Sequence, residues 1–456
     1  MQRVALARVL GLGDLSVLSS ASMAPAYSIA ATFGLMVAAS GFGAPLALVV
    51  LAIPAAFIAI AFHRLCEEQP EAGSTYAWTR IAFGARFALF AGWIVVLSYF
   101  VASVASVVPA GIYSLSLLWP GAAADTHAVA LVGGVWVIGA GVLLMTGMRP
   151  TANTTALFLS LEFAALLFFA ILAFTHPAAA QSLQSPKQLL GLGSGGFAGF
   201  LSAMVLAIWV TDGWEVSTYT SEEHTGSDRN PGLGGLIALT VTVGMMVLCS
   251  IAFMRVAPVQ GIADHATDTL AYVALQLGGG WRSWLMVLTV LASSGAALWT
   301  TQLGLSRLLF SAARNGTLPA SLATVHPKFG TPVWSIVVVS AGALALTLLI
   351  AIVPSVKAAL SEVVNASSIL LGLTYIFTGA ACVWYFAKRR VPLTDATRIV
   401  LPALGTLAVT ALLVVNFRSQ SFVDQVIALI CVVVGIIIAA LVGKRPGAKA
   451  PALQRV

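Results

Sequence analysis

Twelve long apolar runs dominate this sequence of 456 residues. Hydrophobic residues make up 59% of it and charged residues only 9%, whereas a typical soluble domain has about 25% charged residues. Each run is close to the roughly 20 residues that a helix needs to cross a bilayer. We therefore predict an all-α membrane protein with 12 transmembrane helices in a single domain, 1–456. The predicted spans are 14–37, 43–62, 85–118, 127–147, 151–175, 195–221, 233–257, 281–312, 333–353, 361–387, 398–416 and 422–443.

The start of the chain has some features of a secretory signal peptide, because Arg3 and Arg8 precede an apolar run. Asp14 lies inside the supposed apolar core, however, and the run continues to Val37 without the start of a mature domain. We expect this segment to be the first transmembrane helix.

The basic residues indicate how the chain is oriented. An even number of spans puts both termini on one side, and cytoplasmic loops carry an excess of Lys and Arg. If that side is cytoplasmic, all but five of the 23 Lys and Arg residues fall on it. The five outside are Lys187, Arg255, Arg282, Lys357 and Arg418. We expect a multi-pass protein of the inner (cytoplasmic) membrane with cytoplasmic N- and C-termini. This rule also accounts for the net charge of +7, so no nucleic acid is expected as a partner.

One stretch, WVTDGWEVSTYTSEEHTGSDRNP at 209–231, combines an apolar beginning with acidic residues. Asp212 and Glu215 lie at membrane depth, where an acidic side chain is costly and marks a functional site. Gly213 between them allows the backbone to leave helical geometry. Unwound backbone at that depth is tolerated only where it is buried in protein or lines a cavity. We predict that the sixth span is a broken helix with a binding site at the break.

The first span carries a second break signal. Pro25, in SSASMAPAYSIAATFG, removes a backbone donor and clashes with the preceding turn. Breaks in the first and sixth spans lie at matching places in two halves, which is typical of transporters built from inverted repeats. We predict a 5+5 inverted repeat, with repeat one at about 14–175 and repeat two at about 195–387. The two extra C-terminal helices occupy about 398–443.

Three polar stretches resemble motifs of the amino acid–polyamine–organocation (APC) superfamily. The loop EEQPEAGSTYAWTRIAFG is similar to its P-x-AGG-x-Y loop, with Ser74 in place of the second Gly. The segment SRLLFSAARNGTLPASLATVHPKFGTP resembles its SR-x(6)-RDG-x-LP loop, with Asn315 in place of Asp. The segment DGWEVSTYTSEEHTGSDRNP is similar to its span-6 motif, in which Glu222 and Glu223 form the acidic pair. The resemblance runs from about Leu10 to the tenth span.

The resemblance implies a secondary active transporter of amino acids that works by alternating access, either proton-coupled or as an exchanger. It places the substrate at the breaks in spans 1 and 6. The substrate carboxylate would contact backbone N–H groups in span 1, and its ammonium would contact carbonyls in span 6, in agreement with the helix dipole. The residues implied are Ser22, Met23, Ala24, Pro25, Ala26, Tyr27, Trp209, Thr211, Asp212, Gly213 and Glu215.

A polyamine or small-amine transporter of the same fold is the alternative. Family members often have Gly-Ser-Gly where this chain has Pro-Ala-Tyr at 25–27. Pro25 cannot donate a hydrogen bond, which leaves room for a substrate without a carboxylate. Asp212 and Glu215 would favour a cationic substrate if both face the cavity. Trp209 and Glu215 resemble the aromatic gate and the proton-sensitive residue of arginine and polyamine exchangers, although plain packing of Trp209 is equally open.

Glu162 lies in the middle of the fifth span, in FLSLEFAALL. Its position resembles the one at which proton-coupled relatives have a lysine that mimics a sodium ion. Glu162 would carry a proton or help hold a cation near Ser293 and Ser294; a structural hydrogen bond between helices is the alternative. We expect Tyr99 in the third span to serve packing, and a place in the lining of the site is the alternative.

Other functions find little support. Cys66, Cys249, Cys382 and Cys431 show no paired spacing, so neither a disulfide framework nor a metal site is expected. No cofactor is expected, and no nucleophile–base set suggests an enzyme. Glu222, Glu223 and Arg229 are expected to form cytoplasmic ion pairs or helix ends rather than to contact the substrate, and their expected role is a latch on the gate. The expected partners are a small-molecule substrate, a proton or exchanged substrate, and the lipid bilayer.

Overall fold

The computed structural model describes residues 5–176, 186–192, 195–266, 268–352, 356–420 and 422–442. Within these ranges the regular structure is helical, apart from one isolated β-bridge between Leu10 and His224. In the described part of the chain, ten stretches are long and apolar enough to cross a membrane, and the first, Leu12–Glu68, contains α1 to α4. The prediction of an all-α membrane protein is confirmed. The long helices are α4 (Ala44–Glu68), α6 (Ala85–Leu118), α7 (Thr126–Met145), α8 (Met148–Thr175), α11 (Asn230–Val256), α14 (Trp281–Arg314), α15 (Val333–Leu349), α16 (Val356–Lys388), α17 (Val400–Ser419) and α18 (Phe422–Val442).

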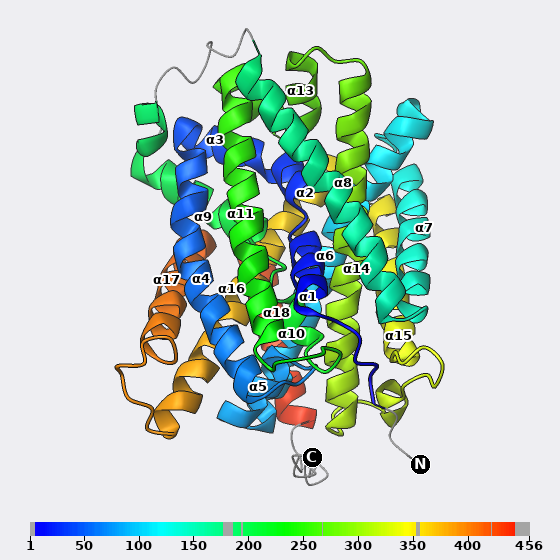
Figure 1. Cartoon of the computed structure of the whole chain (residues 1–456), viewed down its shortest axis with the longest axis vertical. Helices are drawn as coiled ribbons and strands as arrows, with labels where there is room; N and C mark the ends of the chain where they lie inside the picture. Colours follow the sequence, from blue (N-terminus) through cyan, green and yellow to red (C-terminus); the bar gives the residue numbers. More distant parts are fainter. Residues whose placement is uncertain are drawn as a thin grey trace.

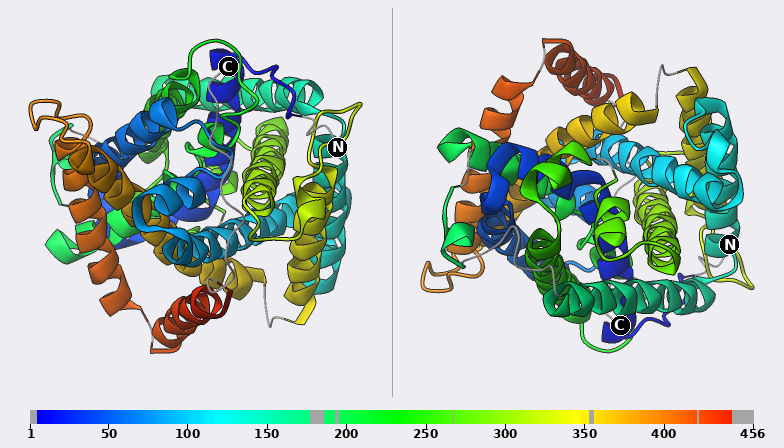
Figure 2. Two further views of the ribbon diagram at one scale, coloured as in Figure 1. Left: turned by 90° about the horizontal axis from the view of Figure 1, so that it is seen from below. Right: turned by 90° about the horizontal axis from the view of Figure 1, so that it is seen from above.

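The long helices run roughly side by side along the long axis of the molecule (Figure 1). The broken first span lies inside the bundle, where α1 (Leu12–Met23) packs against α8, α11 and α14. In the views along the bundle, α17 and α18 lie at its periphery (Figure 2). The short helix α5 (Thr75–Phe83) lies at the lower end of Figure 1, which we call the α5 end.

The first span breaks at Ala24. This residue has φ 47° and ψ 62°, a left-handed conformation that stops α1 at Met23. Pro25 then starts α2 (Pro25–Ser28), because its fixed φ and missing N–H suit the first position of a helix. The helix continues through a π-helical turn at Ile29–Phe33 into α3 (Gly34–Ser40). The break lies where the sequence predicts it.

The sixth span breaks between α9 (Gly196–Val210) and α10 (Val216–Tyr219). Gly213 lies in this break with φ 101°, a value that side chains disfavour. A Cβ atom on Gly213 would lie 2.7 Å from the backbone carbon of Ser22. A glycine is therefore needed at this position for the two breaks to touch.

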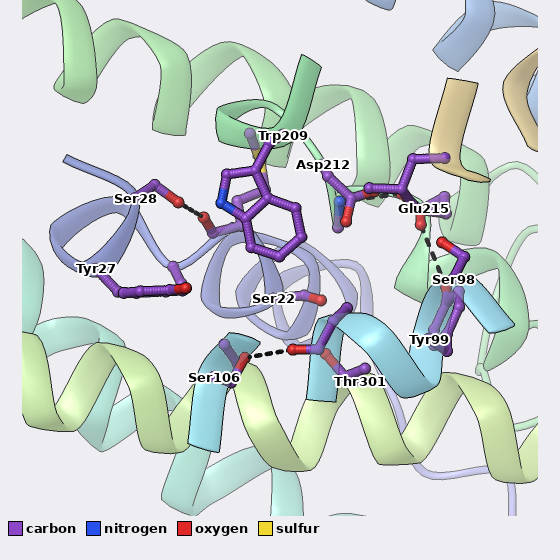
Figure 3. Close-up of a pocket in the computed structure, with 16 residues that line it drawn as sticks. Ser22, Tyr27, Ser28, Ser98, Tyr99, Ser106, Trp209, Asp212, Glu215 and Thr301 are labelled. Atoms are coloured by element: carbon purple, nitrogen blue, oxygen red, sulfur yellow. Dashed lines mark hydrogen bonds between the residues drawn. The ribbon is translucent and has the colours of Figure 1, made fainter. Parts of the chain in front are cut away.

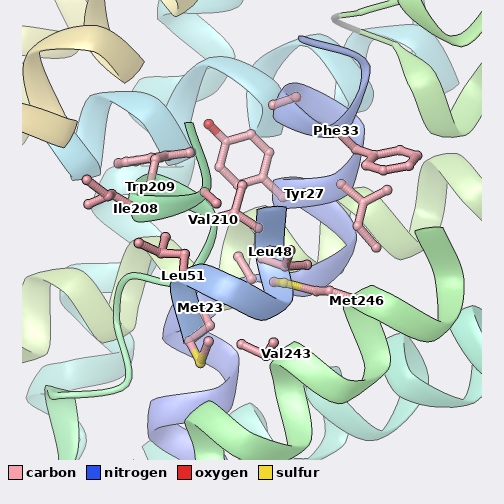
Figure 4. Close-up of a cluster of buried hydrophobic side chains, with 14 of the residues drawn as sticks. Met23, Tyr27, Phe33, Leu48, Leu51, Ile208, Trp209, Val210, Val243 and Met246 are labelled. Carbon is pink, nitrogen blue, oxygen red and sulfur yellow. The ribbon is translucent and has the colours of Figure 1, made fainter. Parts of the chain in front are cut away.

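Apolar side chains from the neighbouring long helices enclose the first break. Leu48 and Leu51 of α4 and Met246 of α11 belong to one buried cluster with Met23 and Tyr27 (Figure 4). Lipid tails are as apolar as these side chains, so close van der Waals packing rather than the hydrophobic effect holds such helices together. The packing fixes the position of both half-helices.

Small residues allow the closest approach between α3 and α9. A Cβ atom on Gly199 of α9 would collide with the backbone carbonyl oxygen of Ala39 in α3. Small residues at helix contacts are typical of membrane bundles. The second half of span 1 is thereby packed directly on the first half of span 6.

We expect Gly199→Ala to lower the melting temperature of the detergent-solubilised protein. Alanine ordinarily favours a helix by about 0.5–1 kcal/mol, but the collision with backbone should cost roughly 1–3 kcal/mol. Gly244→Ala in α11 is the control, since nothing lies within 4 Å of its Cβ position. A Gly199→Ala protein that melts no lower than the Gly244→Ala protein would contradict this packing.

Candidate functional site

A small cavity of about 30 Å³ lies where the two breaks meet (Figure 3). Its walls come from the breaks themselves and from α6, α14 and α16. The lining residues are Ser22, Met23, Ala24, Tyr27, Ser28, Ser98, Tyr99, Ala102, Ser106, Trp209, Asp212, Gly213, Glu215, Ala297, Thr301 and Leu371. This volume has room for one or two water molecules, so a larger ligand requires the side chains or half-helices around the cavity to move.

Most of the residues implied by the family resemblance line this cavity. Three do not: Pro25, Ala26 and Thr211 lie just outside its lining. The Thr211 hydroxyl donates to the Ala207 carbonyl of its own helix at 2.9 Å. The backbone N–H of Ala26 donates a hydrogen bond to Glu162 at 2.8 Å.

The two acidic residues share a set of tyrosine donors. Glu215 accepts hydrogen bonds from the Tyr99 hydroxyl (3.2 Å) and from the Gly213 N–H (3.2 Å). The Tyr375 hydroxyl lies 2.8 Å from Asp212 Oδ1 and 3.4 Å from Glu215 Oε2. Tyr99 has both of the roles considered for it: its ring packs edge-on against Tyr219, and its hydroxyl lines the cavity and donates to Glu215.

The position of Tyr375 depends on aromatic packing. Its ring stacks on Trp214, with ring centroids 5.5 Å apart, and Phe62 of α4 meets both rings edge-on. Tyr375 comes from α16, far from the sixth span in sequence, and sequence reasoning missed it. The available signal was a hydroxyl in an otherwise apolar run, which is weak because buried tyrosines commonly find a partner anywhere nearby.

The ionisable side chains that line the cavity are two acids, Asp212 and Glu215, and two tyrosines, Tyr27 and Tyr99. Among the described residues that line it, none is a lysine, arginine or histidine. Asp212 and Glu215 therefore face the cavity without a cationic partner from its lining. A buried carboxylate is costly unless a hydrogen-bonded opposite charge offsets the loss of hydration, so the arrangement suits a positively charged ligand.

Glu162 of α8 closes the start of α2. Its side chain is fully buried, and its Oε1 accepts the Ala26 N–H at 2.8 Å. Ser293 of α14 accepts the neighbouring Tyr27 N–H at 3.1 Å. Ser294, the other serine predicted to lie near Glu162, donates its hydroxyl to the Val290 carbonyl of its own helix. The structure thus joins Glu162 and Ser293 at α2 but directs the Ser294 hydroxyl elsewhere.

Two ion pairs bind the segment after α10 to the end of α14, at the α5 end. Arg307 donates to both carboxylate oxygens of Glu223 at 2.9 and 3.0 Å, and both side chains are fully buried. Arg314 pairs with Glu222 in the same two-pronged way. Arg229, which is the N-cap of α11, also forms an ion pair, with Glu67.

The loop before α5 and the N-terminal segment complete this closure. The Ala72 N–H donates to Glu222, and Glu71 accepts from Ser311 and Asn315 of the α14 end. The backbone N–H groups of Val9 and Leu10 donate to the Glu223 carbonyl. The cavity is therefore separated from the α5 end by a connected polar network.

Within the described chain, no three His, Cys, Asp or Glu residues form a group that could hold a metal.

The sequence profile of the amino acid permease family matches residues 10–439. The chain belongs to this family, within the APC superfamily. An uncharacterized transporter of Mycobacterium tuberculosis is 28% identical over 382 residues, 81% of each chain. The branched-chain amino acid permease BcaP of Lactococcus lactis is 24% identical over 352 residues, 73% of each chain. The low-affinity putrescine importer PlaP of Escherichia coli is 25% identical over 457 residues, 97% of this chain and 95% of the importer.

We expect Gly213→Ala to abolish ligand binding at the cavity, because a methyl group there would push the two breaks apart. Gly84→Ala is the matched control: Gly84 also has a positive φ, 89°, but nothing lies within 4 Å of its Cβ position. The control separates backbone strain, roughly 1–2 kcal/mol, from the loss of contact between the breaks. Ligand-induced thermal stabilisation of both purified variants measures the difference, and equal stabilisation would refute it.

Proposed function

We propose that this amino acid permease is a secondary transporter that carries amino acids or small amines across the membrane by alternating access. The observation that carries the proposal is the polar cavity between two broken helices inside an otherwise apolar bundle. Half-helices that meet at a buried site are a recurring way to bind a charged small molecule at the bilayer midplane. The family and its relatives are permeases, which argues against an enzyme.

In the proposed topology, the chain forms 12 spans in one transporter domain. Repeat one comprises the spans from α1 to α8, repeat two those from α9 to α16, and α17 and α18 are additions. The pairing of a break in the first span with a break in the sixth supports this division. We place the α5 end in the cytoplasm of a cell whose inner membrane holds the protein, because the basic residues predominate in the loops of that end.

The substrate would sit between Asp212, Glu215 and Trp209, with backbone groups of residues 22–27 on its other side. The two-pronged ion pairs of Glu222 and Glu223 then act as a gate on the cytoplasmic side. Rocking of one helix group against the rest would break these pairs and open the cavity. The fully buried Arg307–Glu223 pair is costly to separate, which favours the closed gate until substrate binding offsets that cost.

Coupling is proposed to run through Glu162 and Glu215. Glu162 Oε2 is buried and has no hydrogen-bond partner in the structure, so it is available to a proton. Glu215 accepts hydrogen bonds from the hydroxyls of Tyr99 and Tyr375 beside the proposed substrate position. A proton on either residue would be sensed by the neighbouring half-helix, which supports proton coupling; obligatory exchange of one substrate for another is the other form that this site allows.

Counterflow in proteoliposomes tests the proposal. Vesicles that contain the purified protein and are preloaded with a mixture of amino acids and amines should accumulate a labelled member of the transported class. The Gly213→Ala protein provides the negative control. Absence of uptake for every labelled amino acid and amine, with and without a pH gradient, would contradict the transport function.

Glu215→Gln should reduce the initial rate of transport at least about tenfold, because an amide loses the charge that pairs with a cationic substrate. It should also flatten the dependence of the rate on pH. Glu67→Gln is the control, since Glu67 lies outside the cavity and pairs with Arg64 and Arg229. A pH profile unchanged in Glu215→Gln would remove Glu215 from the coupling scheme.

A further inference from the structure

The backbone donors at the start of α2 are already in use. A helix N-terminus ordinarily offers free N–H groups to an anion. Here Pro25 has no N–H, Ala26 donates to Glu162 at 2.8 Å, and Tyr27 donates to Ser293 at 3.1 Å. The place where an external carboxylate would bind is therefore held by a carboxylate of the protein itself.

The second break repeats this arrangement. The Gly213 N–H donates to Glu215 Oε2 at 3.2 Å, and the Ser217 N–H of α10 donates to the Ser19 hydroxyl at 3.1 Å. These donors are satisfied by side chains of the protein, so they offer nothing further to a ligand anion. The two breaks thus supply few free donors between them.

Acceptors and negative charge predominate at the same place. The helices α1 and α9 both end at the cavity, and a helix C-terminus carries a partial negative charge. Asp212 and Glu215 add two carboxylates, and the described lining contributes no basic side chain. The electrostatic field of the cavity therefore selects a cation and repels a carboxylate.

Three buried polar atoms of the lining point to a missing ligand. Tyr27 Oη, Ser98 Oγ and Trp209 Nε1 have no hydrogen-bond partner, although these residues are only 2%, 0% and 7% exposed. Buried polar groups nearly always have a partner in native proteins. Ser98 lies beside the acidic pair, while Tyr27 lies on the other side of Trp209 (Figure 3). The ring of Trp209 can also attract a cation by its face.

The indole N–H of Trp209 does not reverse this preference. With the hydroxyls of Tyr27 and Ser98 it makes three neutral donors without a partner, and neutral donors offset only part of the hydration that a carboxylate loses on burial. It suits a neutral acceptor on the ligand or a water molecule.

We propose that the cavity takes a cationic amine that carries no carboxylate, and that Glu162 sets this specificity by occupying the Ala26 N–H at the start of α2. The ammonium group lies between Asp212 and Glu215. Glu162 acts as a surrogate for the carboxylate that an amino acid would bring. This inference rests on the proposed transport function, because it takes the cavity to be the substrate site.

Pairs of compounds that differ only by the carboxylate test the inference: cadaverine and lysine, putrescine and ornithine, 3-methylbutylamine and leucine. Binding to the full-length protein is measured by thermal stabilisation and by competition in counterflow. The decarboxylated member of at least one pair should bind about tenfold or more tightly than its amino acid. The contrary result is that, in every pair with measurable binding, the amino acid binds at least as tightly as its amine. That result would overturn the inference but leave the transport function intact.

Variants of Glu162 test the specificity residue. Glu162→Ala frees the Ala26 N–H, so the amine-to-amino-acid ratio of affinities should fall about tenfold. Glu162→Gln keeps an acceptor for that N–H, so the ratio should stay near the wild-type value. An equal change of the ratio in both variants, or no change in Glu162→Ala, would remove Glu162 from this role. The comparison of amines with amino acids on the wild-type protein needs no variant, so it can contradict the inference even if a Glu162 variant does not fold. Absence of binding and transport for every compound would overturn both this inference and the proposed function.

Discussion

Every backbone N–H and C=O group in the interior of a membrane protein needs a partner, and a broken helix exposes several of them at once. This chain breaks two helices at the same depth, at Ala24 and at Gly213, and then supplies partners from elsewhere in the sequence. Glu162 and Ser293 take the N–H groups at the start of α2. Ser19 and Glu215 do the same at the second break. These hydrogen bonds offset the cost of unpaired backbone groups at the two breaks, so the site can form within an apolar bundle.

The same contacts link fold and function. Glu162 and Glu215 are acceptors for the broken backbone, and in the function proposed above they also sense a proton or a cation. A change in either side chain therefore alters the geometry of a half-helix as well as the charge near the substrate. This coupling offers a physical route from ligand binding to movement of the half-helices, and from there to the ion pairs of Glu222 and Glu223 at the α5 end.

The sequence predicts the all-helical membrane class and the positions of both breaks well, because each rests on a local property. Apolar length indicates a span, Pro25 and Gly213 disturb a helix, and acidic residues in an apolar run mark a site. Contacts between distant segments are harder to predict. Nothing in the sequence indicates that Tyr375 reaches Asp212, or that Arg229 pairs with Glu67 rather than with the neighbouring acidic pair.

The bond between Glu162 and Ala26 shows the same limit most clearly. These residues lie 136 positions apart, and only the packing of α8 against α1 brings them together. The sequence identifies Glu162 as unusual and Pro25 as unable to donate, but it does not relate the two. The structure relates them. At the first break, the Ala26 N–H that was expected to bind the substrate carboxylate is bonded to Glu162 of the protein itself.

A structure of the full-length protein in a lipid nanodisc with a bound substrate tests this account most directly. The account predicts an ammonium group within hydrogen-bond distance of Asp212 or Glu215, with the Ala26 N–H still bonded to Glu162. A substrate carboxylate on the Ala26 N–H, with Glu162 turned away from α2, would contradict it.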